Sequence, residues 1–295
     1  MSFANIKNGP KIALFTGGSG ARGLAQSLAE HTSNSTHIIN TTDSGRSTGI
    51  IRPFFDIPAM GDLRSRLIDL ADRTTTGYAQ VSALLKHRLS PIAEQTILEA
   101  ELDSIMSGNH PLVSAIPQSA REHAVIIRRA LEVFNETRKQ LENKNRTFPL
   151  QNGSIGNFFL TGEYLHYRDM EAAIFLYARL AGVKGTVIPA ILGNYHLWAR
   201  LENDELVFGQ HRITNLENDA KRQADPPIKE MGYYTIGANN KVTACISPEL
   251  NPRVKDAIIG ADAIVYTMGS FYTSILSTLM LPGLGTFIRE SKAPK

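Results

Sequence analysis

The feature that most constrains the fold is a strand-helix-strand pattern near the start of the chain. Residues 11–16 and 36–41 are short apolar runs of strand length, and residues 21–30 between them place Leu24 and Leu28 at helical spacing. Two such strands joined by a helix imply a parallel sheet with a right-handed crossover. We therefore expect an α/β fold, a Rossmann-like three-layer sandwich with a mainly parallel sheet.

Two later regions depart from this alternation. Helical periodicity dominates from about residue 75 to residue 150, which predicts a helical insertion within a single α/β domain spanning residues 1–295. Residues 197–201 and 206–208 alternate apolar and polar side chains on either side of a polar turn, which predicts a small β-hairpin. The polar stretch at residues 215–227 predicts a mobile loop.

The last third of the chain returns to the alternation of strands and helices. Residues 242–246 and 263–267 have strand character, and residues 252–259 between them have helical character. Because this alternation would next supply a strand where the chain stops at Lys295, we expect the protein to continue beyond that residue.

The composition favours a protein that binds phosphorylated small molecules. Apolar residues make up 42% of the chain and charged residues 20%, which is ordinary for a globular protein. The net charge is only +3, and Lys and Arg are scattered without a run of five, which argues against a nucleic-acid partner. A mildly basic cleft for phosphate esters fits this balance better.

The single cysteine, Cys245, excludes an intrachain disulfide and a metal site made of several thiolates. Its apolar neighbours predict a buried strand position, and a lone cysteine favours a cytoplasmic location. No apolar stretch approaches the roughly 20 residues of a membrane span, and residues 1–10 lack the apolar core of a signal peptide. We therefore expect no membrane partner.

A glycine-rich loop follows the first strand. Residues 18–23 match the pattern G-x-G-x-x-G, and an acid, Asp43, follows about 20 residues later at the end of the second strand. Glycines let the backbone approach a phosphate, and the N-terminus of the following helix favours negative charge. Gly18, Ser19 and Gly20 are therefore candidate phosphate-binding residues, with dinucleotide binding and a purely structural tight turn as open alternatives.

The loop after the second strand argues against plain dinucleotide binding. Here Asp43 is followed by a run of glycines and hydroxyl residues that includes Ser44, Gly45 and Ser47. Hydroxyls and backbone amides suit phosphate oxygens, and a carboxylate can hold Mg²⁺ together with phosphates. We predict Ser44, Gly45 and Ser47 as phosphate ligands and Asp43 as a catalytic Mg²⁺ ligand, with a solvated turn as the alternative.

Further candidates lie at the predicted starts of three helices. Asp62 is placed as an N-cap, Asn157 lies in a glycine-rich loop, and Gly269 and Ser270 follow the strand at residues 263–267. Each could be a structural cap. The functional alternative makes Asp62 catalytic, Asn157 a contact to a base or phosphate, and Gly269 and Ser270 phosphate ligands.

Arg64 and Arg66 follow Asp62 in the same predicted helix. They could face a phosphate or could form a solvated face, and the solvated face is favoured for at least one of them. His196 and His211 flank the predicted hairpin and are interpreted as structural.

Several familiar catalytic motifs do not occur. Leu24 rather than Lys follows Gly23, so the first loop is not a Walker loop. Ala21 stands where a nucleophile elbow requires its second glycine, so Ser19 is not predicted to be a nucleophile. The histidines show no H-E-x-x-H spacing.

Taken together, the loops resemble those of the 2-phospho-L-lactate transferases (CofD) and their gluconeogenesis-factor (YvcK-like) relatives. The matching stretches span nearly the whole chain in the family's order, at residues 15–20, 41–49, 61–64, 153–157 and 269–274. The resemblance implies a Rossmann-like core with a helical insertion, Mg²⁺ as cofactor and a homodimer. It departs at Ser44, where the family often has a second acid.

The resemblance leaves two functions open. In the transferase branch, a phospholactyl-type group moves from a guanosine diphosphate ester to an alcohol, with release of GMP. There Asp43 would bind Mg²⁺, Asp62 would orient a metal-bound water or the acceptor hydroxyl, and Asn157 would contact the base or a phosphate. The alternative is a regulatory protein that binds a nucleotide or nucleotide sugar without turnover, which the missing second acid favours. An NAD-dependent oxidoreductase is a third hypothesis, from the first loop alone.

Overall fold

The computed structural model describes residues 9–143, 146–218, 226–237, 242–245 and 248–295. The chain divides into two compact units. The first unit consists of Met1–Gly45, Ile57–Leu63 and Gly185–Lys295, and the second of Arg46–Asp56 and Arg64–Lys184. The expectation of a single domain with an insertion stays a prediction.

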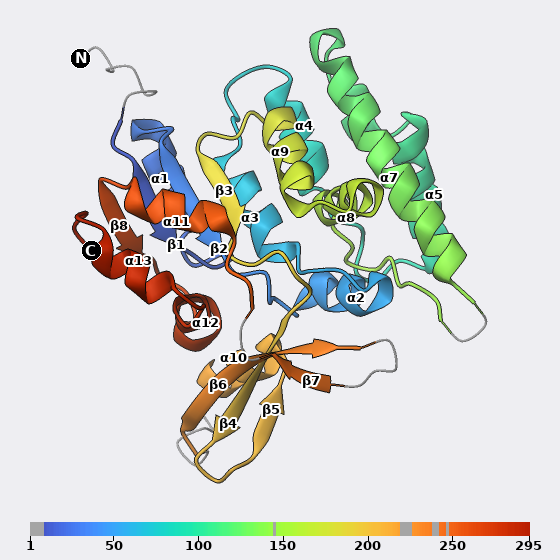
Figure 1. Ribbon diagram of the computed structural model, residues 1–295. Helices are drawn as coiled ribbons and strands as arrows, with labels where there is room; N and C mark the ends of the chain where they lie inside the picture. The colour runs from blue at the N-terminus through green and yellow to red at the C-terminus, as the bar shows by residue number, and fades with distance from the viewer. Residues whose placement is uncertain (1–8, 144–145, 219–225, 238–241, 246–247) are drawn as a thin grey trace. The chain divides into compact units, whose positions relative to one another are not determined.

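The first unit contains the expected parallel sheet. Its strands run in the order β3-β2-β1-β8 and pair in parallel throughout. Their bounds are β1 (Ile12–Phe15), β2 (Ser35–Ile39), β3 (Thr186–Pro189) and β8 (Ala263–Tyr266). Figure 1 shows the sheet flanked by α1 (Arg22–His31), α11 (Pro252–Ile259) and α13 (Leu284–Glu290). The predicted α/β class is confirmed.

The same unit carries a second, antiparallel sheet with the order β5-β4-β6-β7. Its strands are β4 (His196–Leu201), β5 (Leu206–Phe208), β6 (Ile228–Ile236) and β7 (Val242–Cys245). The predicted hairpin is therefore correct but is half of a larger sheet. The expectation that residues 242–246 return to the parallel sheet is wrong, because β7 pairs antiparallel with β6.

One hydrophobic core joins both sheets of the first unit. Phe15 and Ile38 from the parallel sheet, Leu197 and Tyr233 from the antiparallel sheet and Val254 from α11 are all at most 2% exposed within it. Because buried strands of a parallel sheet are covered on both faces, they appear in the sequence as continuous apolar runs. That pattern made β1, β2 and β8 predictable.

A helix occupies the start of the predicted mobile loop. Helix α10 (Gln210–Asn218) covers residues 215–218, so the loop prediction is wrong there. Residues 219–225 and the side chain of Cys245 lie outside what the structure describes.

The second unit is helical. It includes α2 (Arg46–Phe55), most of α3 (Gly61–Leu70), α4 (Tyr78–Lys86), α5 (Gln95–Ser107), α6 (Pro111–Ser114), η2 (Gln118–Ala120), α7 (Arg121–Leu141), α8 (Ile155–Tyr167) and α9 (Met170–Leu180). The helical character predicted for residues 75–150 is confirmed by α4 to α7.

Helices α7 and α8 pack closely in the centre of this unit. The rings of Phe134 and Phe158 stack at 4.2 Å, and Gly162 lies directly against the backbone of Ala130. Arg138, only 1% exposed, is neutralised by Glu99 at 3.2 Å and Glu142 at 3.1 Å. Aromatic packing and a paired buried charge therefore hold the helices together.

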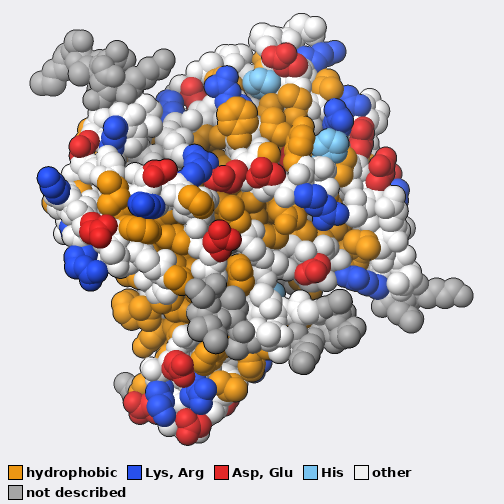
Figure 2. Space-filling model, in the orientation of Figure 1, with side chains coloured by type: hydrophobic (Ala, Val, Ile, Leu, Met, Phe, Trp, Pro, Cys, Tyr) orange, Lys and Arg blue, Asp and Glu red, His pale blue; other side chains and the backbone are white. Residues whose placement is uncertain are grey.

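Figure 2 shows Lys, Arg, Asp and Glu side chains interspersed over the face that it draws. Within the described part of the chain, no single helix is long and apolar enough to cross a membrane. One bent pair, Phe271–Leu279 with Leu284–Glu290, meets the criteria of length and composition, with a bend of 75° between its halves.

Candidate functional site

The loop after β1 packs directly against the loop after β8. A Cβ at Gly20 would lie 2.8 Å from the carbonyl oxygen of Met268 and 3.3 Å from the Cα of Gly269. A Cβ at Gly17 would overlap the hydroxyl of Ser274. These glycines therefore allow two backbones to approach within a distance that a side chain would prevent. The structure thus brings the predicted residues Gly20 and Gly269 together.

Asp62 lies against the same loop. A Cβ at Gly18 would overlap Oδ1 of Asp62 and lie 3.1 Å from its Cγ. The predicted N-cap role is wrong, because α3 begins at Gly61 and places Asp62 inside its first turn. A carboxylate in the first turn is favoured by the helix dipole. The carboxylate is therefore held at the glycine-rich loop by its position on α3.

The loop after β2 is stabilised by a hydrogen bond between its own backbone and the carboxylate of Asp43. Oδ1 of Asp43 accepts a hydrogen bond from the backbone N–H of Gly45 at 3.0 Å. Such a local bond is typical of Asp in turns, and it orients the side chain. Asp43 and Asp62 are both hard oxygen donors, and Mg²⁺ is commonly held by one or two carboxylates together with substrate phosphates. Their chemistry fits the predicted cofactor.

Ser44 ties this loop to the start of α10. Its N–H donates to Oε1 of Gln210 at 3.3 Å, and its hydroxyl is 3.1 Å from Nδ1 of His211, whose backbone N–H also donates to it at 3.1 Å. His211 is therefore a contact of a predicted site residue. Ser44 accordingly has protein partners where the family often has a second acid.

Gln210 continues the connection to the loop after β8. Its Nε2 donates to Oγ1 of Thr273 at 3.3 Å, and that oxygen is 2.6 Å from Oγ of Ser270. Ser270 also accepts from the N–H of Thr273 at 3.0 Å, which caps the π-helix η4 (Phe271–Leu276). A hydrogen-bonded chain therefore runs from Ser44 through Gln210 and Thr273 to Ser270.

Gln210 and Thr273 were not predicted. Gln210 is the first residue of a polar helix, and Thr273 is one of several hydroxyl residues in its segment. Their shared contact joins positions 63 residues apart, which local periodicity does not encode. The only available signal was the clustering of Ser and Thr after Gly269.

Asn157 and Ser47 belong to the second unit, where they contact each other. Asn157 is 1% exposed, and its Nδ2 donates to Oγ of Ser47 at 2.8 Å while its Oδ1 accepts from Nε of Arg64 at 3.2 Å. The Asn157 amide thus holds Arg64 in place. The solvated interpretation is wrong for Arg66, which is fully buried with Asp69 at 3.5 Å.

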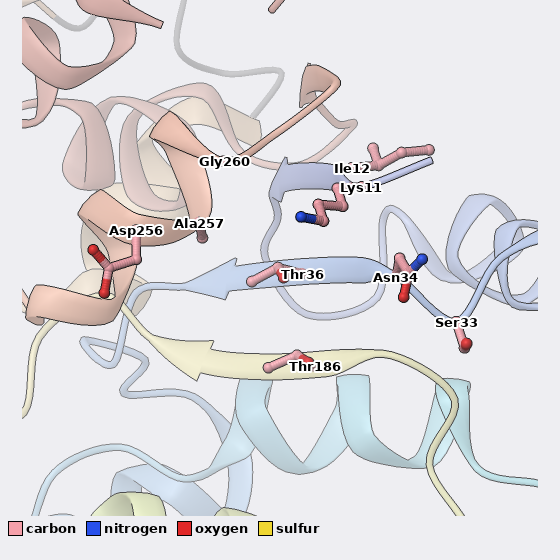
Figure 3. A pocket seen from close by; sticks show the side chains of 9 residues that line it. All are labelled: Lys11, Ile12, Ser33, Asn34, Thr36, Thr186, Asp256, Ala257 and Gly260. Carbon is pink, nitrogen blue, oxygen red and sulfur yellow. The ribbon is translucent and has the colours of Figure 1, made fainter. Parts of the chain in front are cut away.

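A cavity of about 280 Å³ lies at the opposite end of the parallel strands from these loops. It is lined at the amino ends of β1, β2 and β3 by Lys11, Asn34 and Thr186, and by Asp256 from α11 (Figure 3). Ligands of open α/β sheets bind outside the carboxyl ends of the strands. This cavity is therefore not the candidate site.

Three metal-ligating side chains gather in the second unit, where atoms of His87, Glu101 and His110 lie within 4.8 Å of one another. Nε2 of His87 is 2.6 Å from Oε1 of Glu101. However, Nδ1 of His110 accepts from the N–H of Leu112, so its proton sits on Nε2, the atom facing Glu101. This tautomer suits a hydrogen-bonded cluster rather than a metal centre.

Relatives of the chain include proteins named for gluconeogenesis. The Bacillus subtilis gluconeogenesis factor is 25% identical and covers 97% of this chain but only 66% of its own length. An uncharacterized Saccharomyces cerevisiae protein, YNL011C, is 27% identical over 88% of this chain and 70% of its own. A putative gluconeogenesis factor of Nostoc matches over all of this chain but only 48% of itself. The chain thus spans between about half and two thirds of most of these relatives.

The fold has a solved counterpart in a Bacillus halodurans protein, with a TM-score of 0.63 at 23% identity over 97% of this chain and 67% of that one. Another structure of a protein from this organism, described as a member of the UPF0052 family, gives the same TM-score. The family model described as 2-phospho-L-lactate transferase CofD matches residues 12–295. The resemblance found in the sequence is therefore confirmed, and the chain belongs to the CofD family.

Proposed function

We propose that this protein is a Mg²⁺-dependent transferase that moves a phosphoester group, of the phospholactyl type, from a nucleoside diphosphate ester to an alcohol. The observation that carries the proposal is the convergence of the loops after β1, β2 and β8 in the first unit. Gly20 lies against Gly269, and a chain of hydrogen bonds links Ser44 to Ser270. Asp62, at the start of α3, lies against Gly18 of the first of these loops. Close backbones and hydroxyls at the carboxyl ends of strands suit a diphosphate.

In this reaction the acceptor oxygen attacks the phosphorus that carries the ester group. A new P–O bond forms to the alcohol, the bridging P–O bond to the nucleoside monophosphate breaks, and the monophosphate leaves with the bond's electron pair. Asp62 takes up the proton of the alcohol and returns it to water. Mg²⁺ would be held by Asp43 and would supply charge neutralisation for the phosphates. The protein contributes mainly positioning and electrostatics, as is general for phosphoryl transfer.

The test is calorimetric titration with GDP, with and without Mg²⁺. We expect Asp43→Ala to abolish the enhancement of GDP affinity by Mg²⁺, a loss of at least about tenfold, because a metal ligand is removed. The matched control is Asp256→Ala, which removes the same charge at the amino-end cavity and is expected to leave GDP binding unchanged. Unchanged Mg²⁺-dependent binding in Asp43→Ala would show that the assignment of Asp43 is wrong.

A second candidate function is a sensor of nucleotides or nucleotide sugars without turnover. It is favoured by Ser44, whose hydrogen bonds to Gln210 and His211 occupy the position of a possible second metal ligand. The names of the gluconeogenesis-factor relatives favour it as well. Release of GMP from a guanosine diphosphate ester of lactate, with a deazaflavin alcohol as acceptor, supports the transferase. Saturable binding of GDP or a UDP-sugar with no product supports the sensor.

A further inference from the structure

A small cavity lies in the second unit, where α7 packs against α8 and α8 against α9 (Figure 1). Its volume is about 160 Å³. The close contact between Gly162 and the backbone of Ala130 forms part of its lining. Ile126 and Val133, one turn to either side of Ala130, lie on the same face of α7, and Leu176 of α9 also lines the cavity. The cavity therefore has a largely aliphatic wall.

A buried carboxylate, that of Glu163, lines this cavity from α8. Glu163 is 6% exposed, and in the part of the chain that the structure describes it forms neither a hydrogen bond nor an ion pair. Burial raises its pKa to about 6, and the positive charge of Arg129 offsets part of that shift. Buried charges in folded proteins are normally paired or hydrogen-bonded. The Glu163 carboxylate is therefore left to accept hydrogen bonds from a molecule that enters the cavity.

The opposite charge comes from α7. Arg129 is exposed and lines the same cavity. Its charge acts on Glu163, but it too has no hydrogen bond or ion pair with any described residue. The other polar side chains of the lining, His166 and Tyr167, are exposed residues of α8. A ligand with a single charge would be attracted by one of the two charged groups and repelled by the other, whereas a ligand with both charges can pair with both.

The volume of the cavity limits the size of this ligand. Pockets for drug-sized ligands measure roughly 300–1,000 Å³, and a cavity of about 150 Å³ holds a benzene molecule. At about 160 Å³ the cavity is too small for a nucleotide. It suits a short branched aliphatic group that carries two small charged groups.

We propose that the cavity between α7 and α8 binds a small zwitterion with an aliphatic side chain, of the size and chemistry of the α-amino acid valine. The ammonium group of the ligand donates to the carboxylate of Glu163, and its carboxylate accepts from the guanidinium of Arg129. Its side chain packs on the aliphatic wall, which removes apolar surface from water. None of these residues belongs to the candidate transferase site, so binding here does not depend on that reaction.

The test is calorimetric titration of L-valine into the whole chain near neutral pH. We expect saturable binding that is weakened at least tenfold in Glu163→Gln and in Arg129→Gln. Arg129→Lys keeps the positive charge and is expected to fall between wild type and Arg129→Gln. The matched control is Glu132→Gln, an exposed acid of α7 outside the cavity lining, which is expected to change the affinity less than twofold.

Two analogues of valine, each with only one of its charged groups, test whether both charges are needed. Isobutylamine keeps the ammonium group and isovalerate keeps the carboxylate, and each is expected to bind at least tenfold more weakly than valine. No saturable binding of valine, or equal affinity for valine and isobutylamine, would overturn the proposal. So would equal affinity for valine in the wild type and in Glu163→Gln.

The stability of Glu163→Gln separates loss of binding from loss of folding. A raised pKa means that the ionised carboxylate is less stable in the folded protein than in the unfolded chain. Without ligand, Glu163→Gln is therefore expected to raise Tm near neutral pH by about 2–4 °C. Mg²⁺-dependent GDP binding is expected to be unchanged in this variant, so the outcome is independent of the proposed transferase. A lower Tm in Glu163→Gln would show that the carboxylate supports the fold, which would overturn its assignment to a ligand.

Discussion

Replacing Gly18 with alanine is expected to weaken Mg²⁺-dependent GDP binding by about 10- to 100-fold, which is the range for losing a contact to a charged group. The added methyl would overlap Oδ1 of Asp62. Because the side chain of Asp62 is short, it cannot avoid the added methyl and keep its contact with the loop, so the carboxylate must move away from the loop. The methyl also occupies space that a phosphate needs to approach the backbone. Calorimetry with GDP and Mg²⁺ measures the loss.

Gly23→Ala is the matched control, since it adds the same methyl in the same segment and meets nothing within 4 Å. Its GDP affinity should equal that of the wild type. The mechanism through Asp62 is tested in an Asp62→Ala background, where Gly18→Ala should cost much less than in the wild type. Wild-type affinity in Gly18→Ala would mean that neither the loop nor Asp62 contacts the nucleotide.

Replacing Gly162 with alanine is expected to lower the free energy of unfolding of the second unit by about 2–4 kcal/mol. A Cβ there would overlap the carbonyl oxygen of Ala130 and lie 2.7 Å from its carbonyl carbon. Both atoms belong to the backbone of α7, so relief requires α7 and α8 to separate. The higher helix propensity of alanine stabilises the helix by at most about 1 kcal/mol, so the steric clash makes the net change in the free energy of unfolding a destabilisation. Urea denaturation followed by circular dichroism measures the change.

Gly285→Ala provides the comparison for this stability prediction, because it lies in helix α13 with nothing within 4 Å of its added Cβ. We expect its free energy of unfolding to be unchanged or raised by up to about 1 kcal/mol. If Gly162→Ala were as stable as Gly285→Ala, the close packing of α7 on α8 would be wrong.

The parallel sheet could be predicted because its signals are local. Buried strands such as β1 and β8 are continuous apolar runs, and α11 begins with Asn251 as N-cap and Pro252 at its first turn. Strand β6 was missed because its alternation is interrupted by Gly232 and by exposed residues at its start. Helix α10 was missed because its composition is polar, although it carries the buried Ile213.

For the candidate site, too, the sequence predicted the features that have local signals and missed the contacts between distant segments. Glycines and hydroxyls after strand ends mark loops with close backbone approach, which located Gly18, Asp43 and Ser270. The partners that connect the loops, Gln210 and Thr273, depend on contacts between distant segments and carry no motif of their own.

The most direct test of the central claim is a crystal structure of the protein with GDP and Mg²⁺. We predict density for the diphosphate against the backbone of Gly18 and Gly20 and the hydroxyl of Ser270, with the metal on Asp43. Density for GDP in the cavity beside Lys11 and Asp256, at the amino ends of the strands, would contradict the account.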